Sequence, residues 1–140
     1  ASDLSEYSEI YYKKMYNPFT NFQKFINYHK HLENYCAAKQ IKFLNFMTIT
    51  KLPDQNELIN MAKTAYMSRQ DTMLEQKGIE HNYKILKDAL STLNQDVWID
   101  NDIGYCMNDT LAKFPKWKDN HHPGIEASEH WLEVIKKNLN

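Results

Sequence analysis

The feature that most constrains the fold is a pair of short apolar runs that do not follow helical spacing. Residues 41–49 read IKFLNFMTI and residues 97–99 read VWI, so each is too short for a separate helix and typical of a buried strand. The longer segments around these runs repeat apolar residues every three or four positions, as amphipathic helices do. Helices that alternate with buried strands predict an α/β layer structure with a parallel sheet. Two strands are few for the number of predicted helices, so the chain resembles one half of an α/β fold.

Three signals indicate where helices begin. Thr20 with Gln23 and Asp54 with Glu57 have the spacing of a capping box, and Pro123 suits the first turn of a last helix. The apolar spacing predicts helices at residues 4–16, 20–39, 54–67 and 79–93, and from 123 to the C-terminal end. Residues 100–121 are expected to form a long loop with one helical turn at 110–114. The last helix is expected to bury four apolar side chains: Ile125, Trp131, Leu132 and Ile135.

The composition excludes several classes of function. The chain has 140 residues, 17 basic and 18 acidic, and a formal net charge of −1, which argues against electrostatic binding of nucleic acid or membrane surfaces. It has only 3 glycines, so a glycine-rich phosphate loop is absent. Cys36 and Cys106 fit no zinc or redox spacing; a reduced setting is expected, and one disulfide is the alternative. All but one of the basic residues are lysines, a bias typical of AT-rich genomes, including those of many phages.

The densest chemical segment is the stretch KDNHHPG at residues 118–124, ahead of the last helix. An aspartate three residues before a histidine can bring its carboxylate to the imidazole Nδ1. It then holds the tautomer and leaves Nε2 free as a base toward a nucleophile. Asp119 and His122 have this spacing, although spacing alone does not choose between His121 and His122. The alternative is that Asp119 caps the helix and both histidines are solvated loop residues.

At this segment the sequence resembles a known family. Asp119-x-x-His122-Pro123, followed by GIEA at 124–127 and HWL at 130–132, resembles the last block of the SGNH hydrolases, the GDSL-like lipases and esterases. The resemblance implies a flavodoxin-like, three-layer α/β/α fold with a parallel sheet, of which residues 1–140 are a single, C-terminal portion. It also implies that His122 is the general base of the triad and Asp119 its orienting partner. The implied reaction cleaves an ester, such as an acetyl group on a glycan, and needs no cofactor or metal.

The rest of the family pattern is missing. The sequence contains neither the Gly-Asp-Ser block that carries the nucleophile nor the Gly-x-Asn-Asp block, and Asn101-Asp102 is interpreted as a turn after the second strand. The missing blocks, and Ala1 in place of an initiator methionine, favour the C-terminal portion of a longer protein. An N-terminal half or a partner chain would then supply the serine, and this chain alone would be inactive.

Two other hypotheses stay open. With 9 Tyr, 6 Phe and 3 Trp, the chain is rich in aromatic side chains that suit an assembly interface. It could therefore be a non-catalytic structural or binding protein, such as a virion component in an oligomer or larger assembly. Alternatively, His122, Glu126 and His130 are four residues apart on one predicted helix face, where a metal ion is geometrically possible, so a small metal-dependent enzyme is a third hypothesis.

Overall fold

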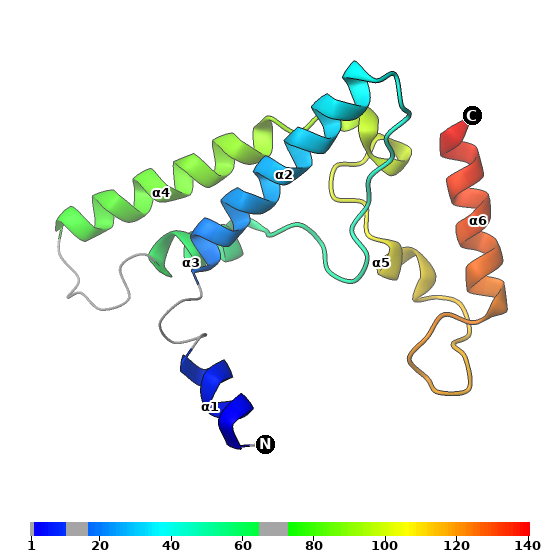
Figure 1. Cartoon of the computed structure of the whole chain (residues 1–140), viewed down its shortest axis with the longest axis horizontal. Coiled ribbons are helices and arrows are strands. Elements are labelled where there is room, and N and C mark those ends of the chain that lie inside the picture. Colours follow the sequence, from blue (N-terminus) through cyan, green and yellow to red (C-terminus); the bar gives the residue numbers. More distant parts are fainter. Residues whose placement is uncertain (1, 11–16, 65–72) are drawn as a thin grey trace. The chain divides into compact units, whose positions relative to one another are not determined.

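The computed structural model describes residues 2–10, 17–64 and 73–140 (Figure 1). The elements, in order, are α1 Ser2–Ile10, α2 Pro18–Ala38, α3 Gln55–Thr64, α4 Met73–Ser91, the 3-10 turns η2 Gln95–Val97 and η3 Ile99–Asn101, α5 Met107–Leu111 and α6 Ile125–Leu139. The chain divides into two compact units. The first unit comprises residues 1–29 and 53–92, and the second unit comprises residues 30–52 and 93–140.

The helix starts agree with the sequence signals only in part. Asp54 Oδ1 accepts a hydrogen bond from the Glu57 backbone N–H at 2.9 Å, which confirms the signal that opens α3. The signal at Thr20 is wrong, because α2 already begins at Pro18 and the Thr20 N–H donates to Asn17 Oδ1 at 3.3 Å. The ends of two predicted helices, at residues 11–16 and 65–67, lie outside the described residues.

The first unit has a core made by helices. α3 packs against α4, where Leu58, Ala62 and Leu86 are buried. The Asn82 side chain, also buried, donates a hydrogen bond to the Ala62 carbonyl oxygen at 3.5 Å. The predicted helix at residues 79–93 is confirmed, and α4 begins earlier, at Met73.

The predicted α/β fold, a flavodoxin-like three-layer structure with a parallel sheet, is wrong. The described residues are mostly helical and form no sheet. The expected strand at 41–49 makes only single-residue parallel bridges in the second unit, where Asn45 pairs with Trp98 and Met47 with Cys106. The backbone bonds include Asn45 N–H to Val97 O at 2.7 Å and Met47 N–H to Tyr105 O at 2.7 Å.

Turn-forming residues explain why these bridges do not extend into a ladder. Val97 ends one 3-10 turn and Ile99 begins the next, so only Trp98 between them is extended. Asp100 and Asn101 then adopt φ 53°, a left-handed conformation that Asp and Asn tolerate better than other non-glycine residues. The interpretation of Asn101-Asp102 as a turn is confirmed, although the expected second strand is absent.

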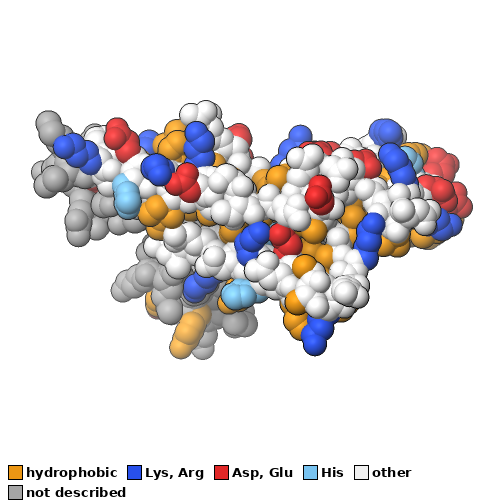
Figure 2. All heavy atoms as spheres, turned by 90° about the horizontal axis from the view of Figure 1, so that it is seen from above, with side chains coloured by type: hydrophobic (Ala, Val, Ile, Leu, Met, Phe, Trp, Pro, Cys, Tyr) orange, Lys and Arg blue, Asp and Glu red, His pale blue; other side chains and the backbone are white. Residues whose placement is uncertain are grey.

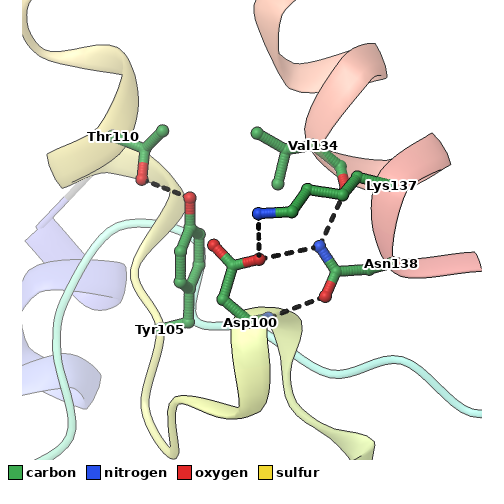
Figure 3. A network of polar contacts seen from close by, with 6 residues as sticks. All are labelled: Asp100, Tyr105, Thr110, Val134, Lys137 and Asn138. Atoms are coloured by element: carbon green, nitrogen blue, oxygen red, sulfur yellow. Dashed lines mark hydrogen bonds and ion pairs between the residues drawn. The ribbon is translucent and has the colours of Figure 1, made fainter.

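A polar network anchors α6 in the second unit (Figure 3). The Asp100 backbone N–H donates to Asn138 Oδ1 at 2.7 Å, and Asn138 Nδ2 donates back to Asp100 Oδ1 at 3.1 Å. Lys137 Nζ lies 3.5 Å from the same carboxylate. On the same helix, the Trp131 ring contacts Phe46 edge-on at 4.9 Å between ring centroids. These contacts determine which face of α6 turns toward its own unit.

None of the helices within the described ranges combines the length and hydropathy needed to cross a membrane.

Candidate functional site

The segment that carries Asp119 and His122 is a loop closed by its own backbone. Lys116 and Pro123 form an antiparallel bridge, and the Trp117 N–H donates to the His122 carbonyl oxygen at 2.9 Å. The Gly124 N–H donates to the Pro115 carbonyl oxygen at 3.3 Å, just before α6 begins. The helix therefore starts at Ile125, with Gly124 as its N-cap, and not at Pro123 as the sequence predicts.

The structure brings Asp119 and His122 together. His122 Nδ1 lies 2.5 Å from Asp119 Oδ2, while Asp119 Oδ1 accepts the backbone N–H of His121 at 2.9 Å and of His122 at 3.0 Å. The ring that contacts the carboxylate thus belongs to His122. The alternative that Asp119 caps α6 is wrong, because its hydrogen bonds all stay within the loop and Gly124 occupies the N-cap.

These contacts predict an acidic Asp119. The hydrogen bond from the His122 side chain, followed by the two backbone N–H groups, holds the pKa of Asp119 well below its ordinary value of 3.8. The carboxylate therefore stabilises the loop fully above pH 3.8, and this contribution is lost as the pH falls through the folded pKa. We expect His122→Ala to raise the pKa of Asp119 but to leave it below 3.8, because both backbone donors remain. A carbon-detected NMR titration of the carboxyl group measures both values, and an unchanged pKa in the variant would contradict this account.

The pair lacks the other parts of an acyl-transfer site. The His122 side chain is 79% exposed, and none of the described hydroxyl or thiol side chains is hydrogen-bonded to its ring. Ser128, the serine nearest to it in sequence, donates its hydroxyl to the Gly124 carbonyl oxygen at 3.0 Å, as serines inside helices often do. A triad needs a nucleophile beside the imidazole and donors for the oxyanion. The geometry supplies only an oriented, solvated imidazole.

The alternative metal spacing of His122, Glu126 and His130 does not form a site among the described residues. His130 lies with its ring 4.8 Å from that of Phe114, between centroids. Across the ranges that the structure describes, no three His, Cys, Asp or Glu side chains are placed to hold a metal ion. Cys36 and Cys106 are both free thiols, so the alternative that they form a disulfide is wrong.

Sequence reasoning missed an exposed apolar face on α6. Ile125 and Leu132, both expected in the core, are 64% and 51% exposed, whereas Ala127 is buried on the inward side. Leu139 and Trp117 are also at least half exposed. We name the α6 outer face by its residues: Trp117, Ile125, Ser128, Leu132 and Leu139. The signal for it is a second stripe of apolar residues spaced by seven, because a helix can turn only one stripe toward its own unit.

An open pocket lies on this face. Its volume is about 340 Å³ and its lining residues are Trp117, Pro123, Gly124, Ile125, Ser128, Glu129 and Leu132. Another cavity of the second unit, about 360 Å³, is more polar. Within it Lys51 and Asp109 pair with each other, with Nζ 3.1 Å from Oδ2. The pocket on the α6 outer face is therefore the one suited to an apolar ligand or side chain.

Comparison with protein-family models, with curated proteins and with solved structures found no match for this chain. The resemblance to SGNH hydrolases therefore depends on the motif residues alone. Neither the helical fold nor the comparisons support the expected description of the chain as a flavodoxin-like hydrolase, an esterase or a phage protein.

Proposed function

We propose that this protein is a non-catalytic binding protein whose contact surface is the α6 outer face. One observation carries the proposal: four large apolar side chains, Trp117, Ile125, Leu132 and Leu139, are each at least half exposed. Three of them line the open pocket described above. Clustered exposed apolar side chains beside a pocket mark interaction sites in many proteins.

The anchoring of α6 explains why this face stays exposed. Trp131 packs against Phe46, and Asn138 is hydrogen-bonded to Asp100, so the helix cannot rotate to bury its other stripe without losing both contacts. On the face of the molecule drawn in Figure 2, hydrophobic side chains reach the surface between charged ones. Burial of these apolar side chains by a partner would stabilise the complex by about 25 cal/mol for every Å² of apolar surface removed from water.

Ester hydrolysis is the alternative function. It is supported by the contact between Asp119 and His122, and it requires a serine and oxyanion donors from another segment or chain. The imidazole is exposed to water, and the described residues form no sheet of the kind that carries the nucleophile in such hydrolases. The binding proposal needs no group beyond those that the structure places.

An apolar fluorescent probe, anilinonaphthalene sulfonate, tests the binding proposal. We expect saturable binding to the full chain, weakened roughly tenfold by Leu132→Asp because the charge is placed in the pocket lining. Ile49→Asp is the control, since Ile49 is also a large exposed apolar residue, 73% exposed against 51% for Leu132, but does not line the pocket. Helical circular dichroism of each variant shows that the fold is retained.

Two outcomes contradict the proposal. One is probe binding that Leu132→Asp and Ile49→Asp weaken equally, which would place the probe elsewhere. The other is catalytic turnover of an activated acetyl ester by the full chain that His122→Ala reduces tenfold or more. We expect the unmodified chain and the His122→Ala variant to hydrolyse the ester at the same slow rate. An exposed imidazole without a nucleophile beside it is a weak catalyst.

A further inference from the structure

The α6 outer face has the spacing of a helix-pairing seam. Ile125, Leu132 and Leu139 are seven residues apart, and Ser128 and Ile135 occupy the intermediate positions three residues after the first two. Apolar residues that alternate at three and four positions form the narrow stripe along which two helices pack. Across the described part of the chain, no element covers the pocket on this stripe, and its leucines are half exposed.

The charges on α6 are divided between its two ends. Glu126, Glu129 and Glu133 lie in the first part of the helix, and Lys136 and Lys137 lie in the last turn. Two copies aligned in parallel would set like charges side by side, which is unfavourable. An antiparallel pair sets the acidic part of each helix against the basic end of the other.

From this complementarity we infer that two copies of the chain associate through antiparallel pairing of their α6 helices. In the alignment that brings the two apolar stripes into contact, Leu132 of one copy packs beside Ile135 of the other. Glu129 then lies opposite Lys136 of the second copy, on both sides of the two-fold axis. Lys136 Nζ already lies 3.7 Å from Glu133 Oε1 in its own helix, and its side chain is 60% exposed, so it is accessible to a second carboxylate from the other copy. The inference rests on the proposed binding function of the α6 outer face.

The pocket gives this register a steric reason. Antiparallel alignment with Leu132 beside Ile135 brings Leu139 of one copy to Ser128 of the other. Ser128 has a small side chain and lines the open pocket together with Trp117, Ile125 and Leu132. A leucine side chain fits within the pocket volume of about 340 Å³, so each copy would insert Leu139 into the pocket of the other.

Sedimentation velocity of the full chain over a range of concentrations tests the inference. We expect a reversible dimer whose dissociation constant rises at least tenfold in Leu132→Asp and stays unchanged in the control Ile49→Asp. Leu139→Asp provides a second disruption at an exposed helix end, in case Leu132→Asp changes the fold. The circular dichroism of every variant is measured at the same concentrations.

Charge exchange tests the antiparallel orientation. Glu129→Lys and Lys136→Glu should each weaken the dimer roughly tenfold, because each single change converts two symmetric ion pairs into repulsions. The double variant should restore the dissociation constant to within about twofold of the original value, because both pairs re-form with exchanged partners. Under parallel pairing Glu129→Lys would leave the dimer unchanged or strengthen it.

The outcomes separate this inference from the proposed function. A chain that stays monomeric, or a dimer that neither Leu132→Asp nor Leu139→Asp weakens, overturns the pairing. So does a double charge variant that fails to recover. If the apolar probe still binds the pocket in those cases, the binding function stands with another partner. If the probe does not bind either, both proposals fail.

Discussion

Replacing Trp98 by alanine is expected to lower the free energy of unfolding of the second unit by about 3–5 kcal/mol. The Trp98 side chain is 1% exposed and is among the largest fully buried side chains of the described residues. Its backbone forms the bridge to Asn45, and the next residue, Ile99, is also fully buried. Deleting the indole removes the side chain at the bridge between Asn45 and the segment at 97–99. Since domains of this size are stable by only about 5–15 kcal/mol, much of the second unit's stability would be lost.

Urea unfolding followed by circular dichroism measures this loss. Trp117→Ala is the matched control, because it deletes the same side chain from an exposed loop position and should cost less than about 1 kcal/mol. A similar loss in both variants would mean that Trp98 is not the core residue that its burial indicates.

Replacing Gly124 by alanine is expected to open the loop that holds Asp119 and His122. A Cβ atom at this position would lie 2.6 Å from the Pro115 carbonyl oxygen, closer than real Cβ contacts allow. That oxygen is backbone and also accepts the Gly124 N–H, so the strain cannot be relieved by a side-chain rotation. We expect a loss of about 1–3 kcal/mol, the usual cost of an added methyl group in a site without room for it.

Thermal unfolding and the NMR titration of Asp119 measure the two consequences. In Gly124→Ala the pKa of Asp119 should move up toward 3.8, because an opened loop loses the donors that hold the carboxylate. Lys118→Ala, an exposed change in the same loop, should alter stability by less than about 0.5 kcal/mol. An alanine variant with unchanged stability and unchanged titration would show that residues 115 and 124 can separate without cost.

The contact between Asp119 and His122 could be predicted because it is local. The two residues are three positions apart, and the carboxylate reaches both the ring and the backbone N–H groups of the same turn. A catalytic role for this contact could not be predicted in the same way, because the nucleophile would have to come from a residue distant in sequence. No spacing within residues 118–124 carries that information.

The buried faces of the helices were predicted less well, because the contacts that select them come from residues distant in sequence. Spacing correctly placed helices over much of α2, α3, α4 and α6, but it put Ile125 and Leu132 in the core, and both are exposed. α6 carries two apolar stripes, and only contacts with Phe46 and Asp100, far away in sequence, select the one that is buried. On α2 the buried positions include Glu33, which hydropathy alone assigns to the surface.

The sequence by itself determined where most helices form, how α3 is capped and that Asp119 reaches a histidine of its own loop, because each depends on residues within about one turn of each other. The tertiary structure decided that the runs at 41–49 and 97–99 form isolated bridges and not a sheet. It also decided which side of α6 is left exposed. Both outcomes depend on contacts between residues about 40 to 85 positions apart, whose free energy is set by the packing around them and by the turns that interrupt them.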